Sequence, residues 1–259
     1  MNIIIPMTGY GSRFVAAGYK ELKPFIPVYG QPILKWIVDG IYPGKENIIF
    51  VCRKEHLDTI TDMRDQLKEI APSATIFEIK DWIKKGPVYD VLMASDAIPD
   101  DEPCIINYCD FFMEWDWPAM RKRILNRECD GCIPCYTGFH PHLLPIQNVY
   151  ASCLTDEEDN LIEIREKYSF EVDKTRARHS PGNYYFRTGA IMKKYAQMLV
   201  ESGEAINGEY YASMIYNNMV RDGLKVWVPT DIEYFCQWGT PEDLQESLYW
   251  IDKMKGIYE

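Results

Sequence analysis

The sequence contains no long apolar run. No stretch of its 259 residues approaches the roughly 20 consecutive apolar residues that a membrane-spanning helix needs, so we expect no membrane partner. The amino-terminal residues do not show a basic segment followed by an apolar core, the pattern of a secretory signal peptide. We therefore expect a cytoplasmic protein whose eight cysteines are reduced.

Basic residues are fewer than acidic ones. The chain has 28 Lys and Arg against 39 Asp and Glu, which gives a formal net charge of −11. A general nucleic-acid-binding protein carries a basic face, so this balance argues against nucleic acid as a partner. It does not argue against a nucleotide, because a few local cations and a metal ion can hold a triphosphate in an acidic protein.

The chain also lacks a second cysteine pair of the kind that completes a zinc site. One cluster combines Cys129, Cys132 and Cys135 with His140 and His142. Residues 131–136 have the pattern of a strand, and a spacing of three sends the thiols of Cys132 and Cys135 to opposite faces. We predict structural cysteines here, with a metal site as the alternative.

A glycine-rich loop follows the first strand directly. Residues 2–7 form an apolar run typical of a strand buried on both faces in a parallel sheet. Gly9 and Gly11 let backbone N–H groups surround an anion without interference from a Cβ. Arg13 offers a planar fork of donors, and Lys23 a compact positive charge. This pattern predicts a polyphosphate-binding loop, against the alternative of a β-turn with two solvated cations.

A dinucleotide-binding Rossmann loop is a second alternative. Phe14 stands where the third glycine of its fingerprint would be. The next strand ends in Cys52-Arg53 rather than in an acid that could bind a ribose. Both departures disfavour that interpretation.

Hydrophobic periodicity predicts alternating strands and helices in the first half of the chain. Strands are expected over 47–52, 74–79 and 103–110, and helices over 31–42, 54–70 and from 87 onward. This order implies a parallel sheet with right-handed crossovers. From about residue 129 strands alternate with loops instead, over 130–136, 147–154, 161–167 and 183–189. Helices over 190–201 and near 211–219, strands over 224–228 and 232–236, and a closing helix from Pro241 complete the chain.

Two further positions are candidates for phosphate chemistry. Lys84, Lys85 and Gly86 precede a helix whose positive dipole end would face the carboxyl edge of the sheet, although a solvated turn is equally compatible. Asp110 follows the central strand, where a carboxylate can hold Mg²⁺ on phosphates. A helix N-cap is the alternative for such an acid, and Asp116 fits it better.

These motifs together resemble the sugar-phosphate nucleotidyltransferases. The shared features are Gly-x-Gly-x-Arg, Lys-Pro ten residues later, a middle strand ending in Asp, Glu-Lys after a strand, Tyr-Tyr-Phe before a glycine, and Trp-Gly-Thr-Pro-Glu-Asp-Leu near the end. Gly18-Tyr19, Lys23-Pro24-Phe25 and Glu114-Trp115-Asp116 most resemble the nucleotidyltransferases of capsule and lipopolysaccharide clusters. Those include the CTP:phosphoglutamine cytidylyltransferase type.

The resemblance implies a Rossmann-like α/β fold of the GT-A kind, with a mixed, mainly parallel sheet flanked by helices. It implies one domain over 1–259, with a nucleotide-binding half (1–128) and a β-rich acceptor-binding half with the closing helix (129–259). The partners would be a nucleoside triphosphate, with CTP favoured, and a phosphorylated small molecule such as a sugar phosphate or phosphoglutamine. A homodimer is left open.

The resemblance also assigns residues to roles. Arg13, Lys23 and Lys167 would be catalytic. The nucleotide would be bound by Met7, Thr8, Gly9, Tyr10, Gly11, Ser12, Arg13, Lys23, Lys85, Gly86 and Asp110. The acceptor would be bound by Glu166, Lys167, Tyr185 and Arg187.

The resemblance implies Mg²⁺ held by Asp110, with Gln237 at the position where many members of the family carry a second metal-binding Asp. A neutral amide is a weaker ligand for this hard cation. Either Asp110 alone holds the ion together with phosphates and water, or Glu209 or Asp231 takes the place of the second Asp.

The implied reaction is attack by an acceptor phosphate oxygen on the α-phosphorus of the triphosphate, with release of pyrophosphate. A phosphate monoester is already nucleophilic at neutral pH, so alignment and charge neutralisation suffice. A glycosyltransferase is the alternative, but Asp110-Phe111-Phe112 lacks its Asp-x-Asp. A non-catalytic nucleotide-binding domain is favoured only by Gln237.

Overall fold

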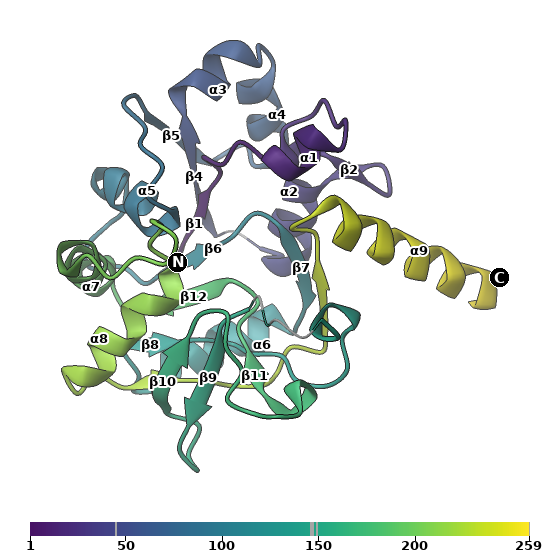
Figure 1. The fold of residues 1–259 in the computed structure, drawn as a ribbon. Helices are drawn as coiled ribbons and strands as arrows, with labels where there is room; N and C mark the ends of the chain where they lie inside the picture. Colours follow the sequence, from purple (N-terminus) through teal and green to yellow (C-terminus); the bar gives the residue numbers. More distant parts are fainter. Residues whose placement is uncertain (45, 146–147, 149, 259) are drawn as a thin grey trace.

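A seven-stranded sheet with the order β13-β8-β12-β6-β1-β4-β5 forms the centre of the molecule (Figure 1). The computed structural model describes residues 1–44, 46–145, 148 and 150–258. Neighbouring strands run parallel except where β12 pairs with β6 and β8, so the predicted mainly parallel sheet is confirmed. The strands are β1 (Asn2–Pro6), β4 (Asn47–Arg53), β5 (Thr75–Ile79), β6 (Cys104–Asn107), β8 (Gly131–Cys132), β12 (Asn183–Phe186) and β13 (Val226–Trp227).

Helices cover both faces of this sheet, and β1 is buried on both sides as its apolar run predicts. Ile3 and Ile5 pack into one core and Ile4 into the other. The first core is covered by α2 (Ile33–Trp36), the π-helical turn η2 (Ile37–Ile41), α3 (Lys54–Thr59), α4 (Met63–Ile70) and α6 (Trp117–Asn126). The second is covered by α5 (Pro87–Met93), α7 (Gly189–Ser202) and α8 (Ile215–Arg221).

Two predicted helices are interrupted. The helix expected over 31–42 begins only at Ile33, because the two residues before it form β3 (Gln31–Pro32) against β2 (Pro27–Val28). The helix expected over 54–70 divides into α3 and α4. The break follows Thr59, because Ile60 has an extended backbone conformation (φ −100°, ψ 93°). The Thr59 hydroxyl donates to the carbonyl of Glu55 (2.7 Å), a contact that often bends a helix.

Strands in the second half are shorter than predicted, and some pair outside the central sheet. A three-stranded sheet contains β9 (Ser152–Thr155), β10 (Leu161–Arg165) and β11 (Arg178–His179). Residues 147 and 149 of the expected strand over 147–154 lie outside the described residues. The expected strand over 103–110 ends at Asn107, and a separate strand β7 (Phe111–Glu114) pairs with β14 (Tyr234–Gln237). Asp110 therefore lies in the turn between β6 and β7.

The remaining elements are short, apart from the closing helix α9 (Pro241–Tyr258), which projects from the body of the molecule (Figure 1). The Thr240 hydroxyl accepts the backbone N–H of Asp243 (3.1 Å), as expected of an N-cap. The short elements are α1 (Ser12–Ala16), η1 (Lys23–Phe25), η3 (Ser95–Ala97), η4 (Pro141–Leu143), η5 (Lys174–Arg176) and η6 (Ala212–Met214).

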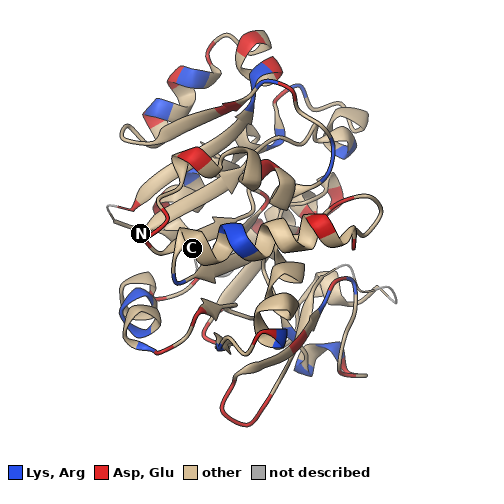
Figure 2. Ribbon diagram, turned by 90° about the vertical axis from the view of Figure 1, so that its left-hand side faces the viewer, with Lys and Arg blue, Asp and Glu red and all other residues tan. Residues whose placement is uncertain are grey.

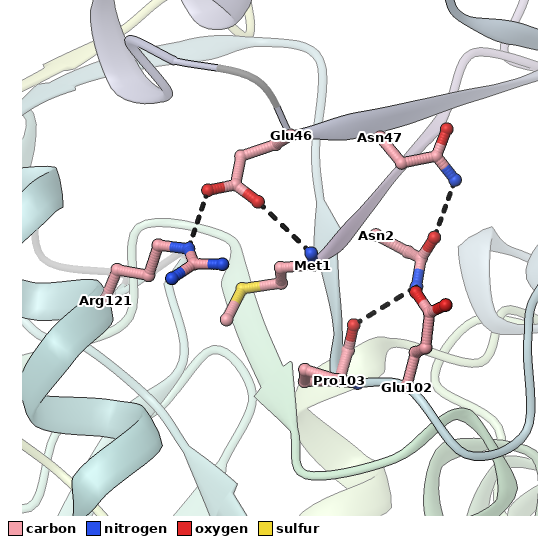
Figure 3. A network of polar contacts seen from close by, with 7 residues as sticks. All are labelled: Met1, Asn2, Glu46, Asn47, Glu102, Pro103 and Arg121. Atoms are coloured by element: carbon pink, nitrogen blue, oxygen red, sulfur yellow. Dashed lines mark hydrogen bonds and ion pairs between the residues drawn. The ribbon is translucent and has the colours of Figure 1, made fainter.

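Polar contacts join neighbouring strands at the amino edge of the parallel strands (Figure 3). The Asn2 side chain accepts from Asn47 (2.6 Å) and donates to Glu102 (3.0 Å), which joins β1 to β4 and to the segment before β6. Glu46 bonds the Met1 amine (3.3 Å) and Arg121 (2.9 Å). These contacts hold the strands together at this edge, whereas α/β proteins usually bind ligands at the opposite, carboxyl edge.

All eight cysteines are free thiols, and seven of them are buried, the exception being Cys109. Cys132 packs into the first core and Cys135 into the second, so the two thiols point to opposite faces as predicted. The described residues contain no group of three or more His, Cys, Asp and Glu side chains that could hold a metal ion. Acidic and basic residues are interspersed along the ribbon in Figure 2. None of the described helices combines the length and apolarity of a membrane span.

Candidate active site

A cavity of about 450 Å³ opens where β1 and β6 end. Its walls come from the glycine-rich loop, the segment before α5, the turn after β6 and the segment before η6. Ten of the predicted nucleotide-binding residues line it: Met7, Thr8, Gly9, Tyr10, Gly11, Ser12, Arg13, Lys23, Gly86 and Asp110. The structure thus collects side chains from distant parts of the sequence at the carboxyl edge of the sheet, where α/β proteins usually bind ligands.

The glycine-rich loop is held open by its backbone conformation. Gly11 has φ +61°, in the left-handed region, and its carbonyl accepts the N–H groups of Phe14 (2.8 Å) and Val15 (3.1 Å) in α1. A Cβ placed on Gly9 would meet no atom within 4 Å, so the space beside it is open. Arg13 is exposed, and it has no ion-pair partner among the described residues. Its guanidinium is therefore available for an anion.

Lys23 and Asp110 form an ion pair inside the cavity. Lys23 Nζ lies 3.0 Å from Asp110 Oδ2, and the side chains are 19% and 26% exposed. Burial on its own would lower the pKa of the Lys23 ammonium, but the adjacent Asp110 carboxylate more than offsets this, and the pKa is raised. Lys23 therefore stays charged at neutral pH.

Gln237 lies beside Asp110, although it does not line the cavity. The backbone N–H of Trp238 donates to the Asp110 carbonyl (2.8 Å). A Cβ on Gly239 would lie 2.4 Å from Gln237 Nε2 and 3.6 Å from Asp110 Oδ2, so both side chains converge on this glycine. The Gln237 atom nearest this glycine is the amide nitrogen, a donor that cannot bind a cation, so the amide would have to turn over for its oxygen to join Asp110 on a Mg²⁺ ion.

The two substitute ligands considered for Gln237 are placed differently. Asp231 is ion-paired with Arg123 (2.9 Å) outside the cavity lining, so it cannot replace a ligand beside Asp110. Glu209 lines the cavity and is paired with Lys84 (3.1 Å). Lys84 also lines the cavity, whereas the predicted Lys85 does not and lies 4.7 Å from the Tyr89 ring.

Gly86 can carry no side chain. Its φ is +90°, and a Cβ there would lie 2.7 Å from the backbone nitrogen of Tyr210 and 2.9 Å from Glu209 Cβ. The Tyr210 N–H donates to the Lys85 carbonyl (2.8 Å), and Val88 N–H donates to the Tyr210 carbonyl (3.2 Å). This close approach fixes one wall of the cavity.

The cavity has a second end that the sequence pattern did not reveal. Asp90 in α5 is 3% exposed, and its carboxylate accepts from the Thr8 hydroxyl (2.5 Å) and the Trp82 indole N–H (2.9 Å). Burial raises the pKa of Asp90 to about 6, although the two hydrogen bonds oppose the shift. Arg53 lies close by, 3.8 Å from the Tyr10 ring and 4.2 Å from the Trp82 ring. In the sequence, the only sign of this buried carboxylate is a single acid among the apolar positions of α5.

Glu166 and Lys167 adjoin the cavity without lining it. The Glu166 carboxylate accepts from Ser213, and burial raises its pKa. Lys167 is exposed with φ +54°, and its Nζ lies 5.8 Å from the ring of Tyr211, a lining residue. Both could reach a ligand that extends past Tyr211.

Tyr185 and Arg187 are not at the site, which corrects their predicted role. Because β12 runs antiparallel to β6, its end pairs with Cys104, at the amino edge of the sheet. Tyr185 is 2% exposed in the first core, and Arg187 donates to the Cys129 carbonyl (2.6 Å). Neither lines the cavity.

Solved structures of similar fold include pyrophosphorylases and nucleotidyltransferases. A nucleoside-diphosphate-sugar pyrophosphorylase from Vibrio cholerae has a TM-score of 0.76 at 19% identity and covers 95% of this chain and 99% of its own. This chain therefore shares its fold with that pyrophosphorylase. An inositol-1-phosphate CTP transferase from T. maritima has a TM-score of 0.71 at 15% identity, and the match covers 98% of this chain and 96% of the transferase.

Sequence similarity to curated proteins is weaker. UTP–glucose-1-phosphate uridylyltransferase 2 of Staphylococcus saprophyticus is 29% identical over 147 residues, which span 49% of this chain and about half (50%) of that relative. Uridylyltransferase 1 of the same organism is 24% identical over 216 residues, 74% of this chain and 70% of its own. No family model matches the chain.

Proposed function

We propose that this protein transfers a nucleoside monophosphate from a nucleoside triphosphate to a small phosphorylated acceptor and releases pyrophosphate. The observation that carries the proposal is the cavity itself. It brings the glycine-rich loop, the Lys23–Asp110 pair and the Gly86 wall together at the carboxyl edge of a nucleotidyltransferase fold. The reaction forms a bond between an acceptor phosphate oxygen and the α-phosphorus, and it breaks the bond to the pyrophosphate.

Alignment and charge neutralisation account for the chemistry, because the attacking phosphate needs no general base. Arg13 would bind the leaving pyrophosphate, Lys23 the α-phosphate, and Lys167 the phosphate of the acceptor. Asp110 would hold Mg²⁺ with the amide oxygen of Gln237. The ion would supply positive charge to the phosphates of the bound nucleotide.

We propose CTP as the nucleotide and a sugar phosphate or a phosphorylated capsule precursor such as phosphoglutamine as the acceptor, in the synthesis of bacterial surface polysaccharide. UTP is the second candidate, because the curated relatives are named UTP–glucose-1-phosphate uridylyltransferases. A glycosyltransferase is less well supported. Phe112 stands where the second acid of its Asp-x-Asp would be, and its ring packs against Trp238 with centroids 6.0 Å apart.

The test is a matrix of the common triphosphates against phosphorylated acceptors, with pyrophosphate release as the readout. We expect release only when a triphosphate and a suitable acceptor are both present. An Asp110→Ala variant should lose at least about a hundredfold in turnover, equivalent to roughly 3 kcal/mol of barrier. The matched control is Asp101→Ala, an exposed carboxylate outside the cavity lining. No release from any combination, or undiminished release by folded Asp110→Ala, would refute the proposal.

A further inference from the structure

The two ends of the cavity differ in chemistry, which orients a nucleotide within it. One end carries Arg13, Lys23 and the open glycine loop, and it suits the phosphates. The other carries the rings of Tyr10 and Trp82, each with the Arg53 guanidinium over one face (3.8 and 4.2 Å), so a base there would lie against the remaining ring surface. Asp90 accepts a hydrogen bond from Trp82 and therefore belongs to this second end, where its carboxylate would meet the base; Glu209, which also lines the cavity, is paired with Lys84.

Asp90 is held in a fixed orientation. The Trp82 indole N–H bonds Oδ1 and the Thr8 hydroxyl bonds Oδ2, and both donors line the cavity. Each carboxylate oxygen accepts more than one hydrogen bond, so the group retains acceptor capacity after these two contacts. Arg53, with a side chain 4% exposed, places a positive charge nearby that favours the ionised form.

We propose that Asp90 selects the base by accepting a hydrogen bond from its exocyclic amino group, so that the site takes cytosine in preference to uracil. Cytosine presents an N4 amino donor where uracil presents the O4 acceptor. Against a carboxylate, the uracil oxygen leaves two acceptors facing each other without a proton between them. A buried polar group left unpaired in this way discriminates strongly between substrates. This inference rests on the proposed nucleotidyl transfer.

The decisive variant is Asp90→Asn, which keeps the shape of the side chain. Because the Trp82 indole N–H is only a donor, it holds the amide oxygen of Asn, and the amide nitrogen then lies on the Thr8 side. The cavity therefore gains a donor where it had an acceptor. We expect the wild type to favour CTP over UTP in kcat/KM by at least about tenfold, and Asp90→Asn to reduce that ratio by at least about tenfold.

The control is Asp96→Asn, an exposed carboxylate just after α5 that lies outside the cavity lining, and it should leave the ratio unchanged. Dissociation constants of CTP and UTP, measured calorimetrically without acceptor, should shift in the same direction as the kinetic ratio. If Asp90→Asn does not fold, Trp82→Phe replaces it. That variant removes one donor from the carboxylate and should lower the CTP preference by about three- to tenfold.

Failure of this inference is distinguishable from failure of the proposed function. A wild type that turns over UTP as well as CTP overturns the role of Asp90 alone, as does a folded Asp90→Asn variant with an unchanged ratio. A wild type that releases no pyrophosphate with any triphosphate and acceptor refutes nucleotidyl transfer itself.

Discussion

Replacing Lys23 by Met tests the phosphate end of the cavity. The change removes an ammonium that lies 3.0 Å from Asp110 Oδ2 and keeps most of the aliphatic stem. The ion pair is partly exposed, so its loss should lower the free energy of unfolding by only about 1 kcal/mol. The effect on catalysis should be larger, because in the proposed reaction the ammonium would stabilise the transition state within the cavity. We expect turnover to fall at least about a hundredfold, or some 3 kcal/mol of barrier.

The matched control is Lys35→Met. It removes an ammonium that lies 2.6 Å from Asp39, one helical turn away on the surface. Pyrophosphate release and the melting temperature should be measured for both variants at saturating nucleotide and acceptor. Lys35→Met should leave turnover within about twofold of the wild type. The reasoning fails if folded Lys23→Met keeps turnover within about threefold of the wild type, or if both variants lose it equally.

Three more predictions follow from neighbouring residues. Gln237→Asp should lower the Mg²⁺ concentration for half-maximal activity by at least about threefold, since a carboxylate binds the ion better than an amide. If the Mg²⁺ titration is unchanged, Gln237 is not part of the metal site. Gly86→Ala should lower the melting temperature by roughly 5–10 °C, because its Cβ would meet the Tyr210 backbone. The control Gly203→Ala also has a positive φ (+73°) but no atom within 4 Å of its Cβ, so it should lower the melting temperature less. Burial raises the pKa of Asp90 to about 6, with Glu209 raising it and Arg53 lowering it. The acceptor is therefore ionised above that value and protonated below it, so the CTP preference in kcat/KM should fall between pH 7.5 and 5.5, and Asp90→Asn should show no such change.

The meeting of the glycine-rich loop and Asp110 in one cavity could be predicted from the sequence because each part is local. Gly9, Gly11 and Arg13 follow β1 within one short segment, and the apolar run of β1 identifies it as a buried parallel strand. Asp110 could be placed because it follows another buried strand, and the carboxyl ends of parallel strands meet at one edge.

The site residues that were predicted wrongly depend on the direction of a strand and on contacts between residues distant in the sequence. Periodicity shows that residues 183–186 form a strand, but it does not show that β12 runs antiparallel, which sends Arg187 to the amino edge. The choice between Lys84 and Lys85 depends on the Tyr210 backbone, which bonds the Lys85 carbonyl from 125 positions along the chain. Neither fact is present in any local pattern.

The two ends of the cavity are joined by a hydrogen bond, because Thr8 belongs to the glycine-rich loop and donates to Asp90. The phosphate end depends on backbone conformation at Gly11 and on the Lys23–Asp110 pair. The base end depends on the hydrogen bond that joins Thr8 to Asp90 across 82 positions. A substitution of the same shape, Asp90→Asn, is therefore needed to change the donor–acceptor pattern presented to the base without moving Thr8 and the glycine-rich loop. It follows that similarity to uridylyltransferases over about half of their length does not settle which base this chain takes. We propose that the choice depends on the Asp90 carboxylate and the two donors that orient it.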